Sequence, residues 1–358
     1  FTPRDAISLL AHLVFEPVKE DLPKIITLYD PACGSGGMLT ESREYLLDLG
    51  VRSAAIQLSG TEINPETYAI CKSDLIIKGV DPSGIHWGNT ITENSFSDKS
   101  FGYMITNPPY GKSWKEDKKK IYHEKMLLDH RFELTLTNYV GEEEVLDSTP
   151  RTSDGQLLFL LEEVDKMKPL EFQPQGSRIA SIHNGSSLFT GDAGSGESNI
   201  RRYLIEKDLV EAIIQLPNNI FYNTGISTYV WMLTNKKKDN RKGKVQLIDA
   251  SQAFEKLRKN QGSRNCTIEP YRTDILRVYT GFVEQEANEE LKVGSKIFDD
   301  DDFRYYNVTI ERPLRLRCQF NSLKIDEMLY DSSDIEVSKW LYNTYKDRVF
   351  SGLDSEIP

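Results

Sequence analysis

The sequence predicts a doubly wound, mostly parallel α/β sheet. Two observations support this: short apolar segments alternate with segments of helical periodicity between residues 25 and 234, and a glycine-rich turn follows the first apolar segment. Parallel strands need this alternation, because each crossover connection must be about as long as a helix. We therefore expect functional side chains at the carboxyl ends of the strands, where ligands bind in such sheets.

The elements follow from apolar periodicity and from glycine and proline positions. Residues 4–20 have the apolar spacing of an amphipathic helix. Further helices are expected over residues 38–49, 67–78, 156–168 and 199–207. Strands are expected over residues 25–29, 57–63, 85–87, 101–106, 178–183, 209–216 and 227–234. The connection between the last two strands is short enough for an antiparallel pair.

The length predicts one large domain and an extension, because 358 residues exceed the roughly 100–200 of a typical domain. Residues 1–244 are expected to form the main domain. Residues 245–358, where the alternation weakens, are expected to form a C-terminal docking extension with helices at 321–330 and 336–347. Since the sequence begins without Met, we also expect further residues before Phe1.

The composition is that of an ordinary globular protein, with 39% hydrophobic and 28% charged residues. No apolar run approaches the about 20 residues of a membrane helix, and the first residues do not resemble a signal peptide. The four cysteines lack a CxxC pair, which favours a reducing compartment and argues against a metal site. We expect a cytoplasmic protein that binds neither a membrane nor a metal ion.

The first strand is followed by a glycine-rich turn, Asp30–Gly37, which precedes a helix. No Lys-Ser/Thr follows Gly36 and Gly37, so the turn is not a P-loop, and it is not a clean GxGxxG. Asp30 at the strand tip would repel a pyrophosphate and attract a cation. This pattern favours S-adenosylmethionine, whose ammonium and sulfonium groups are positive, over the alternative of a purely structural turn.

Two more strand ends carry candidate ligands. Glu62 ends the second strand, where an acidic side chain binds ribose hydroxyls in nucleotide-binding α/β folds; alone it can equally be a solvated or capping group. Asn89 follows the third strand and can bind the adenine amino group of a cofactor, or it can be a turn residue.

The fourth strand runs into Asn107-Pro108-Pro109-Tyr110, where two prolines end both sheet and helix. The Asn107 side-chain oxygen and the Pro108 carbonyl are two rigid acceptors that can bind both N–H groups of an exocyclic amine. Accepting these bonds draws the nitrogen towards sp³ and exposes its lone pair. Tyr110 can stack on the base, which must first leave the duplex.

The order FTPR, DPACGSGG, NPPY resembles the N6-adenine DNA methyltransferases. Residues 177–236 and 303–320 resemble the modification subunits of type I restriction-modification systems, so that the resemblance covers most of residues 1–320. It implies a seven-stranded sheet, an N-terminal helical domain that this sequence lacks, and catalysis by Asn107, Pro108, Pro109 and Tyr110. The cofactor contacts that it implies are Thr2, Asp30, Ala32, Gly34, Ser35, Gly36, Gly37, Glu62 and Asn89, the last replacing a commonly acidic residue.

The resemblance also implies S-adenosylmethionine as cofactor and transfer of its methyl group to N6 of adenine in duplex DNA. The partners it implies are one specificity subunit for two modification subunits, and a restriction subunit. Two other functions stay open. Protein glutamine N5-methyltransferases also have NPPY together with a glycine turn, so the chain can be one of these enzymes. Alternatively, it can be a catalytically silent subunit that binds only the cofactor and a partner.

Three features have no settled role. The net charge of −11 is unfavourable for a protein that binds nucleic acid alone, and basic residues concentrate in two runs, 112–120 and 236–244, which can be solvated loops. Residues 191–198 either bind phosphate at a helix start or form a loop capped by Ser198, with Arg201 and Arg202 facing solvent. Phe189 either packs in the core or forms a second wall for a base.

Overall fold

The computed structural model describes residues 2–123, 126–137, 140–222 and 224–305, together with residues 308, 340, 343 and 344. The chain forms two units, Phe1–Tyr306 and Asn307–Pro358, and all the elements below belong to the first. Its α-helices are α1 (Arg4–Phe15), α2 (Gly37–Asp48), α3 (Pro65–Ile77), α4 (Lys115–Ile121), α5 (Gln156–Asp165), α6 (Ser186–Phe189), α7 (Gly196–Glu206) and α8 (Arg272–Gly281). Short 3₁₀ turns are η1 (Glu16–Asp21), η2 (Ser53–Ala55), η3 (His130–Phe132), η4 (Asp239–Arg241), η5 (Glu269–Tyr271) and η6 (Asp300–Phe303).

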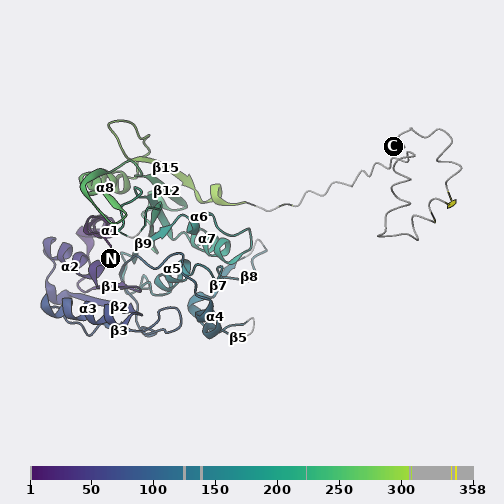
Figure 1. Ribbon diagram of the computed structural model, residues 1–358, viewed down its shortest axis with the longest axis horizontal. Helices are drawn as coiled ribbons and strands as arrows, with labels where there is room; N and C mark the ends of the chain where they lie inside the picture. The colour runs from purple at the N-terminus through teal and green to yellow at the C-terminus, as the bar shows by residue number, and fades with distance from the viewer. Residues whose placement is uncertain are drawn as a thin grey trace. The chain divides into compact units, whose positions relative to one another are not determined.

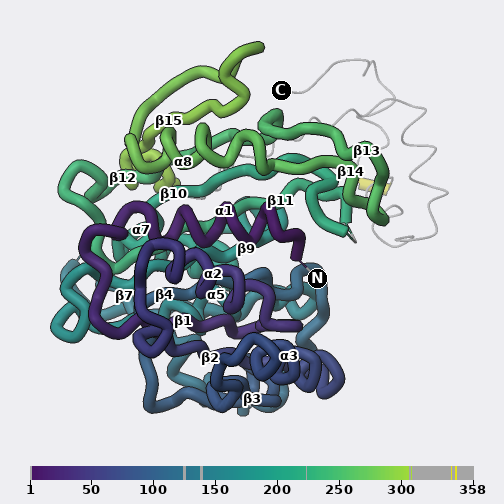
Figure 2. The backbone as a smooth tube through the Cα atoms, turned by 90° about the vertical axis from the view of Figure 1, so that its left-hand side faces the viewer, coloured from purple at the N-terminus to yellow at the C-terminus, as the bar shows by residue number. Residues whose placement is uncertain are grey.

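One large sheet organises this unit, in the strand order β15-β12-β10-β11-β9-β4-β1-β2-β3 (Figures 1 and 2). Its strands are β1 (Ile26–Asp30), β2 (Ile56–Glu62), β3 (Ile85–Trp87), β4 (Tyr103–Thr106), β9 (Arg178–Asn184), β10 (Val210–Gln215), β11 (Thr228–Thr234), β12 (Lys244–Asp249) and β15 (Gly294–Asp299). Three two-stranded sheets add β5 (Tyr122–His123) with β6 (Met126–Leu127), β7 (Leu134–Thr137) with β8 (Glu143–Leu146), and β13 (Glu255–Gln261) with β14 (Arg264–Thr267).

The large sheet is mostly parallel, as predicted. β3, β2, β1, β4 and β9 are parallel to one another, whereas β11 is antiparallel to both β9 and β10, as expected from their short connection. The sheet has nine strands, two more than the resemblance implies. The additional strands, β12 and β15, come from residue 244 onwards; β12 pairs with β10, and β15 pairs with β12.

Hydrophobic cores lie on both faces of the sheet, and the central strand β4 contributes to each. Tyr103 and Ile105 belong to the core that contains residues of α1, α2 and α8, and Met104 belongs to the core that contains residues of α5 and α7. This alternation is the period-two pattern of a strand buried on both faces. The doubly wound arrangement is therefore confirmed, with helices covering each side (Figure 1).

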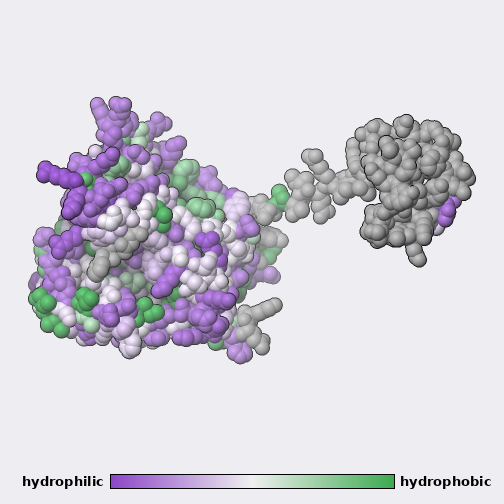
Figure 3. Space-filling view, viewed as in Figure 1, coloured by the Kyte–Doolittle hydropathy of each residue, from purple (hydrophilic) through white to green (hydrophobic). Residues whose placement is uncertain are grey.

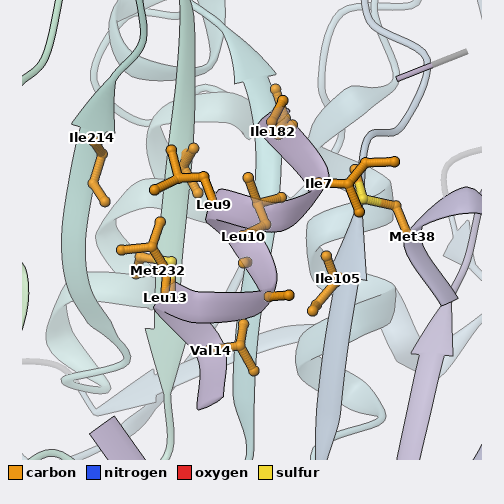
Figure 4. Close-up of a cluster of buried hydrophobic side chains, with 14 of the residues drawn as sticks. Ile7, Leu9, Leu10, Leu13, Val14, Met38, Ile105, Ile182, Ile214 and Met232 are labelled. Atoms are coloured by element: carbon orange, nitrogen blue, oxygen red, sulfur yellow. The ribbon is translucent and has the colours of Figure 1, made fainter. Parts of the chain in front are cut away.

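Helix α1 lies across the centre of one face. Figure 4 shows Leu10 and Leu13 over the strands, close to Ile105, Ile182 and Met232, and all five side chains are buried. The helix is shorter than predicted: it ends at Phe15 and continues as the 3₁₀ turn η1, because proline in its first turn lacks the N–H that a longer α-helix needs. Packing of α1 holds the residues just before it against the end of β4.

Exposed hydrophobic side chains gather over α3, at the lower left of Figure 3, and include Ile70, Ile76 and Ile77. Among the described residues, no helix combines the length and apolarity required to cross a membrane. The helix expected at 321–330 lies outside the described residues, and of the helix expected at 336–347 only Trp340, Asn343 and Thr344 are described, all three as helical.

Candidate active site

The glycine turn and Glu62 lie side by side, because β1 and β2 are parallel neighbours with Asp30 opposite Gly60. Gly34, at φ +54°, donates its N–H to Glu62 Oε2 over 2.9 Å, and Glu62 Oε1 accepts from the Asn64 N–H over 2.7 Å. A Cβ on Gly34 would meet no protein atom within 4 Å. The half-buried carboxylate thus shapes the turn, and the turn borders open space in which a ligand can lie against backbone.

The rest of the turn is packed tightly. Gly36, at φ +82°, has no room for a side chain, since a Cβ would lie 2.8 Å from Cys71 Sγ. Cys33 is buried against Gly60. Gly37 begins α2, and Ala32 and Ser35 are half-buried within the turn.

Asp30 connects the turn to β4. The side chain is 1% exposed, and its Oδ1 accepts from the Ala32 N–H at 3.0 Å and from Thr106 Oγ1 at 2.6 Å. Burial raises the pKa of Asp30 to about 7, although both hydrogen bonds act to lower it. Because Thr106 immediately precedes Asn107, this carboxyl fixes the end of β4 relative to the glycine turn.

Asn107 follows the end of β4 and, within the part of the chain that the structure describes, only the nitrogen of its carboxamide forms a hydrogen bond. Its Nδ2 donates to Thr2 Oγ1 over 3.1 Å. Its Oδ1 is buried and has no hydrogen-bond partner among the described residues. A buried unpaired acceptor costs about 1–3 kcal/mol and is rare in folded proteins. Thr2 thus orients the amide so that its oxygen is available to a ligand.

The three residues that follow complete the tetrapeptide Asn107–Tyr110. Pro108 is buried, Pro109 is exposed and Tyr110 is half-buried. Burial raises the pKa of Tyr110 to about 12, so its phenol is protonated at neutral pH. Gly111, at φ +69°, ends the segment and donates its N–H to Asp154 Oδ1 over 3.0 Å.

Asp154 belongs to a buried polar network that sequence reasoning missed. Gln156 Nε2 donates to Asp154 Oδ2 and to Asn184 Oδ1, both over 2.7 Å, and Gln156 Oε1 lies 3.1 Å from His183 Nδ1. Burial lowers the pKa of His183 to about 3, which keeps it neutral. The network joins the ends of β9 and α5 to Gly111. Its only sequence signal is polar residues placed directly before a helix and directly after a strand.

Asn89 makes contacts at both ends of its carboxamide. Nδ2 donates to Asp117 Oδ1 of α4 over 2.7 Å, and Oδ1 accepts from the Ile91 N–H over 3.0 Å. An amide has a second N–H and a second lone pair, so a further contact remains available to it. The structure therefore connects the loop after β3 to α4, which the sequence did not predict.

The segment after β9 differs from expectation in three respects. Phe189 is 76% exposed, which excludes the alternative that it packs in the core. Ser195, not Ser198, is the N-cap of α7. Arg201 donates to the Ser187 carbonyl and Arg202 pairs with Glu206 and Glu144, so neither extends freely into solvent.

The chain is similar in sequence to proteins of one family. The profile of the N-6 DNA methylase family matches residues 1–314. The chain is 28% identical over 262 residues to the methylase subunit of the type I restriction enzyme MjaIX of Methanocaldococcus jannaschii. The aligned segment covers 73% of this chain and 41% of the relative. It is 31% identical over 258 residues to the MjaVII methylase subunit of the same organism, with coverage of 72% and 40%.

A solved structure, the methyltransferase subunit of a type I restriction-modification system from Streptococcus thermophilus, has a TM-score of 0.65 at 24% identity. This likeness covers 84% of the present chain and 56% of that one, and it confirms the expected fold. The chain spans about two fifths of the length of the two curated relatives, 41% and 40%.

Proposed function

Because the chain belongs to the N-6 DNA methylase family, we propose that it is a catalytic modification subunit of a type I restriction-modification system. It transfers a methyl group from S-adenosylmethionine to N6 of adenine in duplex DNA. The observation that carries this proposal is the buried, unpaired Oδ1 of Asn107 at the end of β4. An acceptor of this kind suits a substrate that brings its own N–H group.

An adenine amine is a poor nucleophile because its lone pair is delocalised into the ring. Asn107 Oδ1 accepts one N–H and the Pro108 carbonyl accepts the other, which localises the lone pair on nitrogen. The Tyr110 ring stacks on the base and holds it outside the duplex. Thr2 keeps the carboxamide oriented, so that the oxygen and not the NH₂ group faces the amine.

The residues present fit S-adenosylmethionine, which supplies an electrophilic methyl group when bound. Gly34 exposes backbone to open space, and Glu62 retains lone pairs for ribose hydroxyls beyond its two backbone contacts. Asp30 holds the turn against β4, and Ala32, Ser35, Gly36 and Gly37 complete the turn. Asn89 is the candidate for the adenine contact.

The names of the relatives describe subunits, which supports a function within a complex. We propose that its partners are DNA, a specificity subunit and a restriction subunit. In this complex, two modification subunits bind one specificity subunit. Residues 245–358, and within them the residues from about 320, are the proposed docking region; of the residues from 320 on, the structure describes only residues 340, 343 and 344. Target choice would then reside in the specificity subunit.

The test is transfer of a labelled methyl group to duplex DNA, with and without the specificity subunit, followed by identification of the modified base by mass. N6-methyladenine is the expected product. Label on a glutamine of a protein substrate, with none on DNA, would favour a protein glutamine N5-methyltransferase. No transfer by the complete complex would favour a silent assembly subunit.

A change at Tyr110 tests the stacking role. Tyr110→Ala is expected to weaken base binding by about 1–3 kcal/mol, the usual contribution of base–aromatic stacking, whereas Tyr110→Phe keeps the ring and most of the activity. Fluorescence of 2-aminopurine at the target position measures the extruded base. A Phe variant as impaired as the Ala variant would assign the function to the hydroxyl group instead.

A change at Glu62 tests the cofactor site. Glu62→Ala is expected to raise the Kd for S-adenosylmethionine by about 10-fold or more, because a hydrogen bond to a charged group contributes roughly 1.5–3 kcal/mol. Glu66→Ala, an exposed carboxylate in the first turn of α3, is the matched control. Isothermal titration calorimetry gives both constants, and equal constants for the two variants would exclude Glu62 from the site.

A further inference from the structure

The two basic runs, 112–120 and 236–244, are similar in sequence but differ in how many of their cations form ion pairs in the structure. Most cations of the run 236–244 are neutralised by ion pairs: Lys237 with Asp208, Arg241 with Glu211, Lys242 with Asp239 and Lys244 with Asp299. Two of these cations, Lys237 and Arg241, are buried. This run therefore stabilises the connection between β11 and β12.

The run 236–244 also lies at the edge of the sheet away from the site. It follows Thr234 of β11, which pairs with Arg178 at the start of β9, and Arg178 in turn pairs with Tyr103 at the start of β4. Asn107 follows the other end of β4. The run 112–120 begins two residues after Tyr110, and two residues of chain span at most about 7 Å between their Cα atoms. The start of this run therefore lies at the same edge of the sheet as Asn107 and Tyr110.

The run 112–120 leaves cations free beside the tetrapeptide. Lys112, Lys115 and Lys120, here called the α4 lysines, are exposed and form no ion pair with any described residue. The acids of the run are already engaged, Glu116 by Lys119 and Asp117 by Asn89. The contact of Asp117 with Asn89 also anchors α4 to the loop after β3.

The local charge is opposite in sign to that of the whole chain. Five lysines and two acids give residues 112–120 a charge of 5 − 2 = +3, against −11 overall. Figure 3 shows hydrophilic side chains at the lower right of the unit Phe1–Tyr306, where Figure 1 places α4. An acidic protein can approach a polyanion only through such a local patch.

We propose that the α4 lysines bind the sugar-phosphate backbone of DNA next to the extruded adenine. This inference rests on the proposed function. A base that leaves the duplex remains bonded to its own phosphates, so those phosphates must lie within one nucleotide of Asn107 and Tyr110. The surface beside the tetrapeptide therefore faces negative charge, and it carries the three unpaired lysines.

The test compares two triple variants in the complex with the specificity subunit. Lys112→Gln/Lys115→Gln/Lys120→Gln removes the α4 lysines, and Lys236→Gln/Lys238→Gln/Lys242→Gln removes three exposed lysines from the other run. Fluorescence anisotropy with a labelled duplex at several salt concentrations gives Kd and its salt dependence. Each lost phosphate contact lowers the slope of log K against log salt by about 0.9, so the first variant should lose about 2–3 and the second none.

An unchanged slope in the first variant overturns the proposal, and so does an equal loss in both variants, which would reflect net charge alone. Affinity for S-adenosylmethionine, measured on the same samples, reports an intact fold. A failure of the proposed function is recognised separately, because the wild-type complex would then transfer no methyl group to DNA whatever its salt slope.

Discussion

Asn107→Ala is expected to abolish methyl transfer while the affinity for S-adenosylmethionine stays within a few-fold of wild type. In the proposed mechanism, the variant loses one of the two acceptors that localise the lone pair of the amine. Removing one preorganised group of this kind lowers kcat by about 10²–10³-fold or more. Single-turnover transfer of labelled methyl, together with calorimetric titration of the cofactor, measures both effects. Near-normal turnover would contradict the acceptor role.

The same variant is expected to fold normally, which separates lost chemistry from lost structure. It gives up the hydrogen bond from Nδ2 to Thr2, which contributes about 0.5–1.5 kcal/mol, but it also removes the unpaired Oδ1, whose burial costs about 1–3 kcal/mol. The free energy of unfolding should therefore change by no more than about 1 kcal/mol. Urea denaturation checks this expectation.

Glu211→Ala is expected to produce the largest loss of stability. Glu211 of β10 is buried, accepts from Arg178 Nη2 and Tyr279 Oη, both over 2.5 Å, and lies 3.5 Å from Arg241 Nε. Its removal leaves two buried guanidinium groups without their carboxylate. Breaking a buried pair in this way costs about 3–5 kcal/mol.

Glu206→Ala is the matched control, because it removes a carboxylate that pairs with a partly exposed arginine, Arg202, and such pairs contribute about 0–1 kcal/mol. Burial acts to raise the pKa of Glu211, but Arg178 and Arg241 lower it below the ordinary 4.5. The stabilisation is therefore present above pH 4.5 and is lost as the pH falls below that value. Equal midpoints of urea denaturation for the two variants at neutral pH would contradict the expectation.

The strands around the site were predictable from sequence because their signals are local. β1 and β4 are short apolar segments that end at residues unable to continue a strand, the glycine turn in one case and Pro108 in the other. The order of the elements then places both ends at one edge of a parallel sheet. The same local signals place Asn107 at this edge, together with Glu62 at the end of the neighbouring strand β2.

Contacts between distant segments were not predictable. Asp154 and Asn184 each occupy ordinary positions at the ends of elements, and only the pairing of β4 with β9 brings them to Gly111. The addition of β12 to the sheet depends on its pairing with β10, for which residues 244–249 carry no specific signal. Likewise, the two basic runs become different only when their ion-pair partners, Asp208 and Asp299 among them, are in place.

The position of β4 between β1 and β9 has a consequence for any shortened version of the protein. A fragment that ended at residue 150 would contain Thr2, the glycine turn, Glu62 and the tetrapeptide, yet it would lack β9. All four residues of β4 are buried in the whole unit, so its open edge would present unpaired backbone groups beside apolar side chains. Such an edge pairs readily with other chains. A shortened version that keeps both edges of β4 paired must therefore extend at least through β9, well past Tyr110.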